Sequence, residues 1–289
     1  MIVDSHVHVF SANSVKYPLS PSAPYDPDPA PLEQLIITMG MSGVDVAVVV
    51  QPQPYEWDNS YLSDSLAEQP ERLIGIGLVD PRSPDAADNL RALAKPGRIQ
   101  GFRLNLDSDD EGLWLTDGTV DPLWKLAADE GLVVCLQIEP QHARNVQTLA
   151  SRFKATRFVV DHLGKPDVTE GASYPSFRPI LDLAGLEGAH IKLSGLFYAS
   201  REDFPYEDTI PIVELVWEAF GARRMLWGTD FPNIFKACGY QAALDHVKQD
   251  LPFCLKTTRH GYLVRRPRRF GTCPTARRLI LNPIWNRRW

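Results

Sequence analysis

Short runs of apolar, often β-branched residues recur eight times along the chain, and stretches with helical spacing separate them. The strands predicted from these runs are Ile2–Val7, Val44–Gln51, Leu73–Val79, Ile99–Leu104, Leu132–Ile138, Arg157–Asp161, His190–Ser194 and Met225–Thr229. Helices are predicted at residues 31–41, 60–69, 84–95, 119–130, 141–152, 175–184, 208–220 and 236–250. Strands and helices that alternate through short connections form parallel sheets. Because eight such units in roughly 250 residues match the size of a closed barrel, the predicted fold class is α/β, a single (β/α)8 TIM barrel.

An open doubly wound sheet is the competing architecture. Such a sheet binds dinucleotides on a glycine-rich turn, and no G-x-G-x-x-G motif follows an early strand here. The closed barrel is therefore favoured. The Pro-rich segment Tyr17–Pro31 is too long for a tight turn, and we predict that it forms an active-site loop.

The formal net charge of −6 is distributed unevenly. Residues 254–289 hold ten of the 30 Lys and Arg and none of the 36 Asp and Glu, so residues 1–253 carry −16 and the rest carry +10. We therefore divide the chain into a barrel, residues 1–253, and an atypical basic C-terminal tail, residues 254–289.

The cysteines and the apolar segments indicate the compartment. Cys135, Cys238, Cys254 and Cys273 show no paired spacing, so neither a disulfide framework nor a zinc ribbon is predicted. The sequence opens without the pattern of a signal peptide, and no apolar run reaches about 18 residues. We expect a cytoplasmic protein that does not bind membranes.

Asp4, His6 and His8 alternate along the first predicted strand, and a period of two predicts that all three share one face. The carboxyl ends of barrel strands surround the active site, so two imidazoles in this position could share a metal ion. The alternative is a strand-end turn with two solvated histidines.

Polar residues also end other predicted strands, and in a barrel these ends converge. They are Gln51, Arg103 with Asn105, Gln137 with Glu139, Asp161 with His162, Ser194 and Asp230. A third histidine and a terminal aspartate that join His-x-His form the set that a hydrolytic metal site needs.

Asp230 and His162 are the strongest of these candidates. A carboxylate after the buried-looking strand Met225–Thr229 could bind a metal and take a proton from an attacking water, whereas its alternative role is a helix N-cap. His162 could ligate a metal or hydrogen-bond a substrate carbonyl, although a lone histidine is more often structural.

Other residues are candidates for shaping a substrate pocket. Arg103 could hold a carboxylate or a carbonyl oxygen through its planar fork, or form an ion pair with Asp107 instead. Four aromatic side chains could line the pocket: Trp57, Trp114, Trp227 and Tyr198. For Trp227, packing in the core is the simpler role.

Five motifs occur in a fixed order: Ile2–Phe10, Gly101–Asn105, Val160–Asp167, Lys192–Gly195 and Leu226–Pro232. Together they resemble the amidohydrolase superfamily, in the branch of TIM-barrel hydrolases that includes 2-pyrone-4,6-dicarboxylate lactonase, L-fuconolactonase-like enzymes and 4-sulfomuconolactone hydrolase. The likeness covers about residues 1–253.

The resemblance implies a role for each matching residue. His6, His8 and Asp230 correspond to metal ligands, His162 to the mid-barrel catalytic histidine, and Asp230 also to the base that activates water. The histidines or a bound divalent ion would polarise the lactone carbonyl. The predicted substrate-binding residues are Arg103, Gln51, Gln137 and Ser194.

The sequence lacks residues that bind a second metal ion in the wider superfamily. Binuclear members supply a bridging carboxylated lysine and a further histidine, whereas the seventh strand here ends in Lys192-Leu-Ser194 without a histidine. We therefore expect at most one divalent ion, Zn²⁺ or Mn²⁺. Metal-independent catalysis, as in some lactonases of this branch, stays open.

The implied function is hydrolysis of a small lactone derived from sugar or aromatic catabolism, with a homo-oligomer left open. Arg103 and Lys165 are the clear cationic anchors, which favours a substrate with fewer carboxylates than a pyrone dicarboxylate. Two alternatives remain. The first is a metal-dependent decarboxylase of the aminocarboxymuconate-semialdehyde type, and the second is a catalytically impaired binding paralogue.

The tail departs from the family pattern, in which an acidic helix start follows a Leu-Pro-Phe-like segment. One back-translation of Phe253–Thr258, read two bases on, encodes Leu-Pro-Glu-Asp-Asp. We therefore hypothesise a frameshift at about residues 251–254. The rival is an arginine-rich arm that binds nucleic acid or a membrane surface. Because the tail contains Pro267, Pro274 and Pro283 but a single lysine, we favour the frameshift and expect no nucleic-acid partner.

Overall fold

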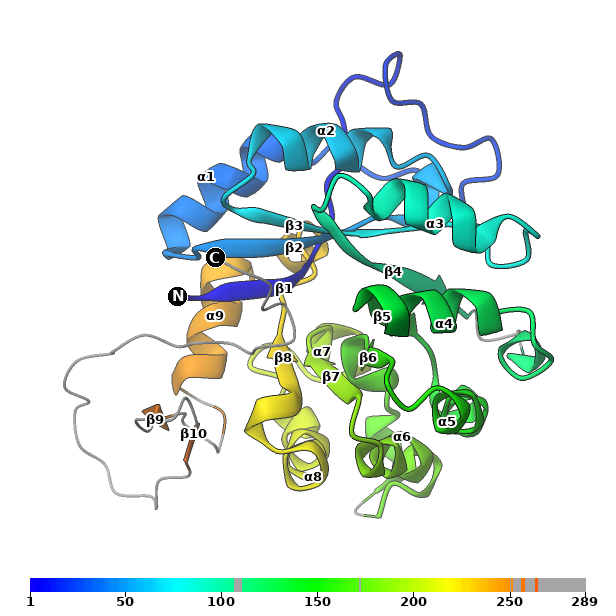
Figure 1. The fold of residues 1–289 in the computed structure, drawn as a ribbon. Coiled ribbons are helices and arrows are strands. Elements are labelled where there is room, and N and C mark those ends of the chain that lie inside the picture. The colour runs from blue at the N-terminus through cyan, green and yellow to red at the C-terminus, as the bar shows by residue number, and fades with distance from the viewer. Residues whose placement is uncertain (107–110, 172, 250, 252–255, 258–262, 265–289) are drawn as a thin grey trace.

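Eight parallel strands form one sheet, in which each strand pairs with the next one along the chain (Figure 1). The computed structural model describes residues 1–106, 111–171, 173–249, 251, 256–257 and 263–264. The strands are β1 (Val3–Val7), β2 (Val46–Val50), β3 (Leu73–Gly77), β4 (Ile99–Asn105), β5 (Val133–Gln137), β6 (Arg157–Val160), β7 (Ala189–Leu193) and β8 (Met225–Trp227). A parallel bridge between Val7 and Phe231 joins the two ends of the sheet. The sheet is thus closed into a nearly complete barrel, and the predicted TIM barrel is confirmed.

Helices connect the strands, and all of them except the short α7 lie outside the barrel (Figure 1). They are α1 (Leu32–Ser42), α2 (Ser60–Glu68), α3 (Ala86–Ala94), α4 (Asp121–Glu130), α5 (Ala143–Arg152), α6 (Arg178–Asp182), α7 (Leu196–Ala199), α8 (Ile210–Phe220) and α9 (Tyr240–Gln249). Each predicted strand is present, with its ends within two residues of the prediction.

The last predicted helix begins later than expected. Its predicted start was residue 236, whereas α9 begins at Tyr240 because Gly239 adopts a φ of +86° that no helix allows. Asn233–Lys236 form a separate short 3-10 turn. The short helix α7 was not predicted.

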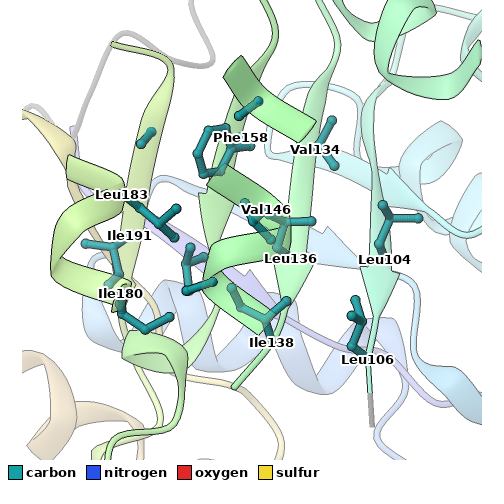
Figure 2. Packing of buried hydrophobic residues seen from close by; sticks show 14 of the residues in the cluster. Leu104, Leu106, Val134, Leu136, Ile138, Val146, Phe158, Ile180, Leu183 and Ile191 are labelled. Atoms are coloured by element: carbon teal, nitrogen blue, oxygen red, sulfur yellow. The ribbon is translucent and has the colours of Figure 1, made fainter. Parts of the chain in front are cut away.

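Two apolar layers enclose the strands. Side chains that alternate along the strands fill the barrel interior, among them Val48, Cys135 and Val159. The opposite faces pack under the helices, and Figure 2 shows Leu136 and Val146 in this outer cluster. Because both faces of each strand are buried, the strands read as nearly continuous apolar runs.

Strand β1 contains a bulge that changes which residues face inward. Asp4 pairs with Ala47 and Val7 with Val49, so one extra residue stands on β1 between these pairs. An extra residue reverses the alternation of side chains beyond it. Asp4 accepts hydrogen bonds from the backbone nitrogen and the hydroxyl of Thr229, at 3.0 and 2.6 Å. The expectation that Asp4 shares a face with His6 and His8 is therefore wrong.

Little of the basic tail is described. Within it, β9 (Lys256–Thr257) and β10 (Leu263–Val264) pair in antiparallel fashion. Residues 252–254 of the hypothesised frameshift and most of residues 254–289 lie outside the described residues. Among the helices that the structure describes, none is both long enough and apolar enough to cross a bilayer.

We expect Leu136→Ala to lower the free energy of unfolding by about 3 kcal/mol, because this fully buried side chain would leave a cavity in the outer layer. Leu113, which is 60% exposed, provides the control, and Leu113→Ala should change stability by no more than about 0.5 kcal/mol. Urea denaturation followed by circular dichroism measures both. Equal losses in the two variants would contradict this assignment of the core.

Candidate active site

Three histidines and one aspartate meet at the carboxyl ends of the strands. His6 and His8 come from β1 and the residue just past it, His162 follows β6, and Asp230 follows β8. The Nε2 atoms of His6 and His8 lie 3.2 Å apart, and Oδ1 of Asp230 lies 3.6 and 3.3 Å from them. The rings of His6 and His162 are 4.5 Å apart between centroids. All four side chains are buried, as the sequence predicted for a converging site.

The backbone around these residues is strained. His162 and Asp230 adopt φ values of +50° and +59°, a left-handed conformation that costs energy for any residue with a Cβ. Hydrogen bonds hold both residues in place: Ser194 Oγ contacts His162 Nδ1 at 3.0 Å, and the Asp230 backbone nitrogen donates to the His6 carbonyl at 2.8 Å. Strain maintained in this way is typical of functional sites.

Two glycines make room for His162 and His6. A Cβ on Gly195 would lie 2.8 Å from Nδ1 of His162, and a Cβ on Gly228 would lie 2.8 Å from Cβ of His6. Only a residue without a side chain fits either position without displacing a histidine. The motifs Lys192–Gly195 and Leu226–Pro232 thus contribute space as well as functional groups.

The carboxylate of Asp230 has one oxygen that is held and one that is open. Oδ2 accepts hydrogen bonds from the Tyr198 hydroxyl at 2.6 Å and from Asn233 Nδ2 at 3.0 Å. Oδ1 is buried, faces the histidines, and accepts no well-aligned hydrogen bond within the described part of the chain. This open oxygen is available to a water proton or a cation.

Burial and neighbouring charges set the protonation of the site. Burial by itself would raise the pKa of Asp230, but the nearby His162, His8 and His6 outweigh it and hold the pKa of that carboxyl well below its usual value. Burial lowers the pKa of His162 to about 4. At neutral pH the site therefore presents an ionised carboxylate and a neutral His162.

A buried ionic cluster lies against these histidines. Asp161 pairs through Oδ2 with Arg103 Nε and through Oδ1 with Lys192 Nζ, both at 2.9 Å, although the second contact lacks the alignment of a hydrogen bond. Lys192 Nζ also lies 3.1 Å from Nδ1 of His6. Burial opposes ionisation of Asp161, yet Lys192, His6 and Arg103 hold its pKa well below the usual value.

The sequence placed Asp161 among the converging strand ends without a specific role, and it gave Lys192 no role in the site. The sequence signal that could have revealed this cluster is the lysine inside the apolar run of β7. A buried lysine is stable only when it is paired, so its presence there indicates a buried acidic partner. Burial and the Lys192 ammonium also hold the pKa of His6 well below its usual value.

The predicted substrate-binding residues have protein partners. Gln137 Oε1 accepts a hydrogen bond from Nη2 of Arg103, and Gln51 donates through Nε2 to the Asp58 carbonyl at 2.7 Å. Ser194 contacts His162. The alternative partner of Arg103, Asp107, lies outside the described residues. Direct contact of these four residues with substrate stays a prediction.

A cavity of about 260 Å³ opens beside Arg103 at the ends of β2, β3 and β4. Its lining includes Ser22 and Pro24, so the Pro-rich segment reaches the site as predicted. The other lining residues are Gln53, Glu56, Trp57, Leu78, Val79, Pro81, Arg103, Leu104 and Asn105. The cavity has both an aromatic wall and hydrogen-bonding groups.

The four candidate aromatic residues occupy different places. Trp57 lines the cavity, and Tyr198 contacts Asp230. Trp227 is packed in the core beside Tyr240, as its simpler role suggested. Trp114 is buried in the outer layer on a turn that contacts α5, and it does not line the cavity.

The donor atoms of the site fit one divalent ion. Within the described residues, His6, His162 and Asp230 offer ligand atoms within 4.8 Å of one another. The predicted set with His8 in place of His162 has spacings of 3.2 to 3.6 Å. Imidazole and carboxylate donors suit zinc and manganese, and the open Oδ1 of Asp230 supplies the anionic ligand. Both sets share His6 and Asp230. That His8 is a metal ligand stays a prediction.

The chain is similar to known lactone hydrolases and to solved amidohydrolase structures. An L-fucono-1,5-lactonase from Burkholderia ambifaria is 31% identical over 237 residues, which cover 80% of each chain. A 4-sulfomuconolactone hydrolase from Rhizobium radiobacter is 27% identical over 80% of this chain and 75% of its own length. A solved amidohydrolase from Burkholderia multivorans with bound zinc has a TM-score of 0.70 at 22% identity, covering 86% of this chain and 90% of that one.

The family model for amidohydrolases matches residues 3–270. Together with the relative that is 31% identical, this match confirms the resemblance carried by the five ordered motifs. The chain belongs to the amidohydrolase family.

Proposed function

We propose that the protein is a hydrolase that opens a small lactone by attack of water, with Asp230 as the general base. The observation that carries the proposal is the open Oδ1 of Asp230, which is buried against His6 and His8 while Tyr198 and Asn233 hold Oδ2. A carboxylate held in this way has one defined oxygen toward which a water can be oriented. The names of two similar relatives, an L-fucono-1,5-lactonase and a 4-sulfomuconolactone hydrolase, support the same reaction.

The reaction assigns one step to each group. Asp230 Oδ1 takes a proton from water as the water oxygen bonds to the lactone carbonyl carbon. His162 is held through Nδ1 by Ser194, so its other nitrogen can hydrogen-bond the carbonyl oxygen as negative charge develops there. The ring C–O bond then breaks, and the proton on Asp230 passes to the ring oxygen. Water is consumed and a hydroxy acid is formed.

One divalent ion would be compatible with these residues. His6 and Asp230 would hold it together with His8, which leaves His162 to the carbonyl, or together with His162, whose contact with the carbonyl the ion would then replace. When bound, such an ion would act as a Lewis acid that polarises the carbonyl.

The charges around the cavity favour a neutral, hydroxylated lactone. Arg103 is paired with Asp161, and Lys165 Nζ lies 3.1 Å from Oε1 of Glu139. Glu56 lines the cavity, and hydrogen bonds from Ser20 and Ser22 hold its pKa below the usual value. A sulfonated or dicarboxylated lactone would meet this carboxylate without an unpaired cation among the described lining residues. Sugar hydroxyls, in contrast, can donate to Glu56.

We expect Asp230→Asn to lower kcat by about 10³-fold, because the amide cannot accept the water proton. Asp88→Asn, on the exposed face of α3, is the matched control and should retain activity. Acid release from L-fucono-1,5-lactone in a pH-stat measures turnover, and circular dichroism checks the fold. Near-normal turnover of Asp230→Asn would remove this mechanism, and release of carbon dioxide from carboxylated substrates would favour a decarboxylase.

We expect L-fucono-1,5-lactone to have a higher kcat/KM than 4-sulfomuconolactone. Glu56→Gln should lower the ratio of kcat/KM for L-fucono-1,5-lactone to kcat/KM for 4-sulfomuconolactone by about fivefold, since it removes one anionic group from the cavity. Glu68→Gln, whose residue is exposed on α2 away from the cavity lining, controls for net charge. An unchanged ratio in Glu56→Gln would mean that this carboxylate does not select the substrate.

A further inference from the structure

Lys192 is a buried cation in direct contact with a histidine of the site. Its side chain is fully buried on β7, with Nζ 3.1 Å from His6 Nδ1 and 2.9 Å from Asp161 Oδ1. Asp161 is paired with Arg103 as well, so one carboxylate faces two basic side chains. This cluster therefore places excess positive charge next to His6.

The partners of the two β1 histidines determine where their protons lie. An ammonium can only donate, so Nδ1 of His6 accepts from Lys192, and the neutral ring carries its proton on Nε2. A backbone carbonyl can only accept, so Nδ1 of His8 donates to Val50 O at 2.7 Å and its Nε2 keeps the lone pair. The Nε2 proton of His6 then points to His8 Nε2, at 3.2 Å. Every link in this chain of hydrogen bonds runs in the same direction.

Metal binding through His6 Nε2 requires the opposite tautomer. A histidine that ligates through one nitrogen donates its other N–H to an acceptor. For His6 that acceptor is Oδ1 of Asp161, which lies 3.5 Å from Nδ1. Lys192 and Asp161 thus compete for the same nitrogen, and Lys192 is the closer of the two. His8 needs no such change, because its Nδ1 donates to Val50 in either state.

We propose that Lys192 sets the divalent-metal affinity of this site: its ammonium holds His6 in the tautomer that cannot ligate a metal and adds positive charge beside the place where an ion would bind. The residue is a positioning residue that acts through His6. The inference concerns metal affinity and holds whichever lactone the enzyme accepts.

Removal of the ammonium tests this role directly. In Lys192→Met, Asp161 keeps its pair with Arg103 and becomes the single partner of His6 Nδ1, so the ring can present its Nε2 lone pair. We expect this variant to bind one Zn²⁺ per chain with a Kd lower than that of the unmodified protein by about tenfold or more. Lys125→Met removes a charge from an exposed pair with Asp129 on α4, and its Kd should be unchanged.

The measurement is titration of chelator-treated protein with Zn²⁺ and with Mn²⁺ by calorimetry, with metal content checked by mass spectrometry. Zinc binding by Lys192→Met that is equal to or weaker than that of the unmodified protein would overturn the proposal, because a lysine that serves only packing would give that result. Circular dichroism establishes that the variant is folded before the titration.

A second experiment needs no variant of Lys192. Long-range ¹H–¹⁵N spectra of the chelator-treated, unmodified protein report the tautomer of each histidine, with assignment by single His→Gln variants. We expect the Nε2–H form for His6 and the Nδ1–H form for His8. A proton on Nδ1 of His6 in the metal-free protein would refute the proposal independently of how Lys192→Met folds.

Discussion

The seam between β1 and β8 is the contact on which the site depends. Across it, Asp4 binds Thr229, although 225 positions separate them in the chain. Two backbone hydrogen bonds complete the seam: Asp230 donates to the His6 carbonyl at 2.8 Å, and His8 donates to the Phe231 carbonyl at 2.7 Å. Without this closure, Asp230 and the β1 histidines would stand at opposite edges of an open sheet. Barrel closure and assembly of the site are therefore one event.

The site also depends on buried charges that are costly to bury alone. Asp161 and Lys192 are fully buried, and transfer of either ion from water carries a penalty of several kcal/mol. Their mutual contact and the pair with Arg103 offset that penalty. The same contacts orient His6, so the groups that compensate one another also define the chemistry of the ring above them. This explains why a lysine is tolerated inside a strand that otherwise reads as core.

Much of the site was predictable because strand ends converge in any closed barrel. His6, His8, His162 and Asp230 were identified from their positions at strand ends, and the structure brings them together. Asp4 was placed on the wrong face because a bulge leaves no mark in a strand of five residues. The contacts of Arg103 with Asp161 and Gln137 were also not predictable, since they depend on the register between β4, β5 and β6 and on how the side chains pack.

The sequence by itself determined the order of the elements, the barrel class, the family and the residue types at the strand ends. These properties follow from local periodicity and short motifs, which each segment carries within a few residues. Tertiary structure alone decided that Asp161 lies between Arg103 and Lys192, that Lys192 reaches His6, and that Oδ1 of Asp230 stays open. Proton positions on the histidines depend on such contacts between strands distant in the chain, because each ring takes its tautomer from the donor or acceptor that packing places beside it.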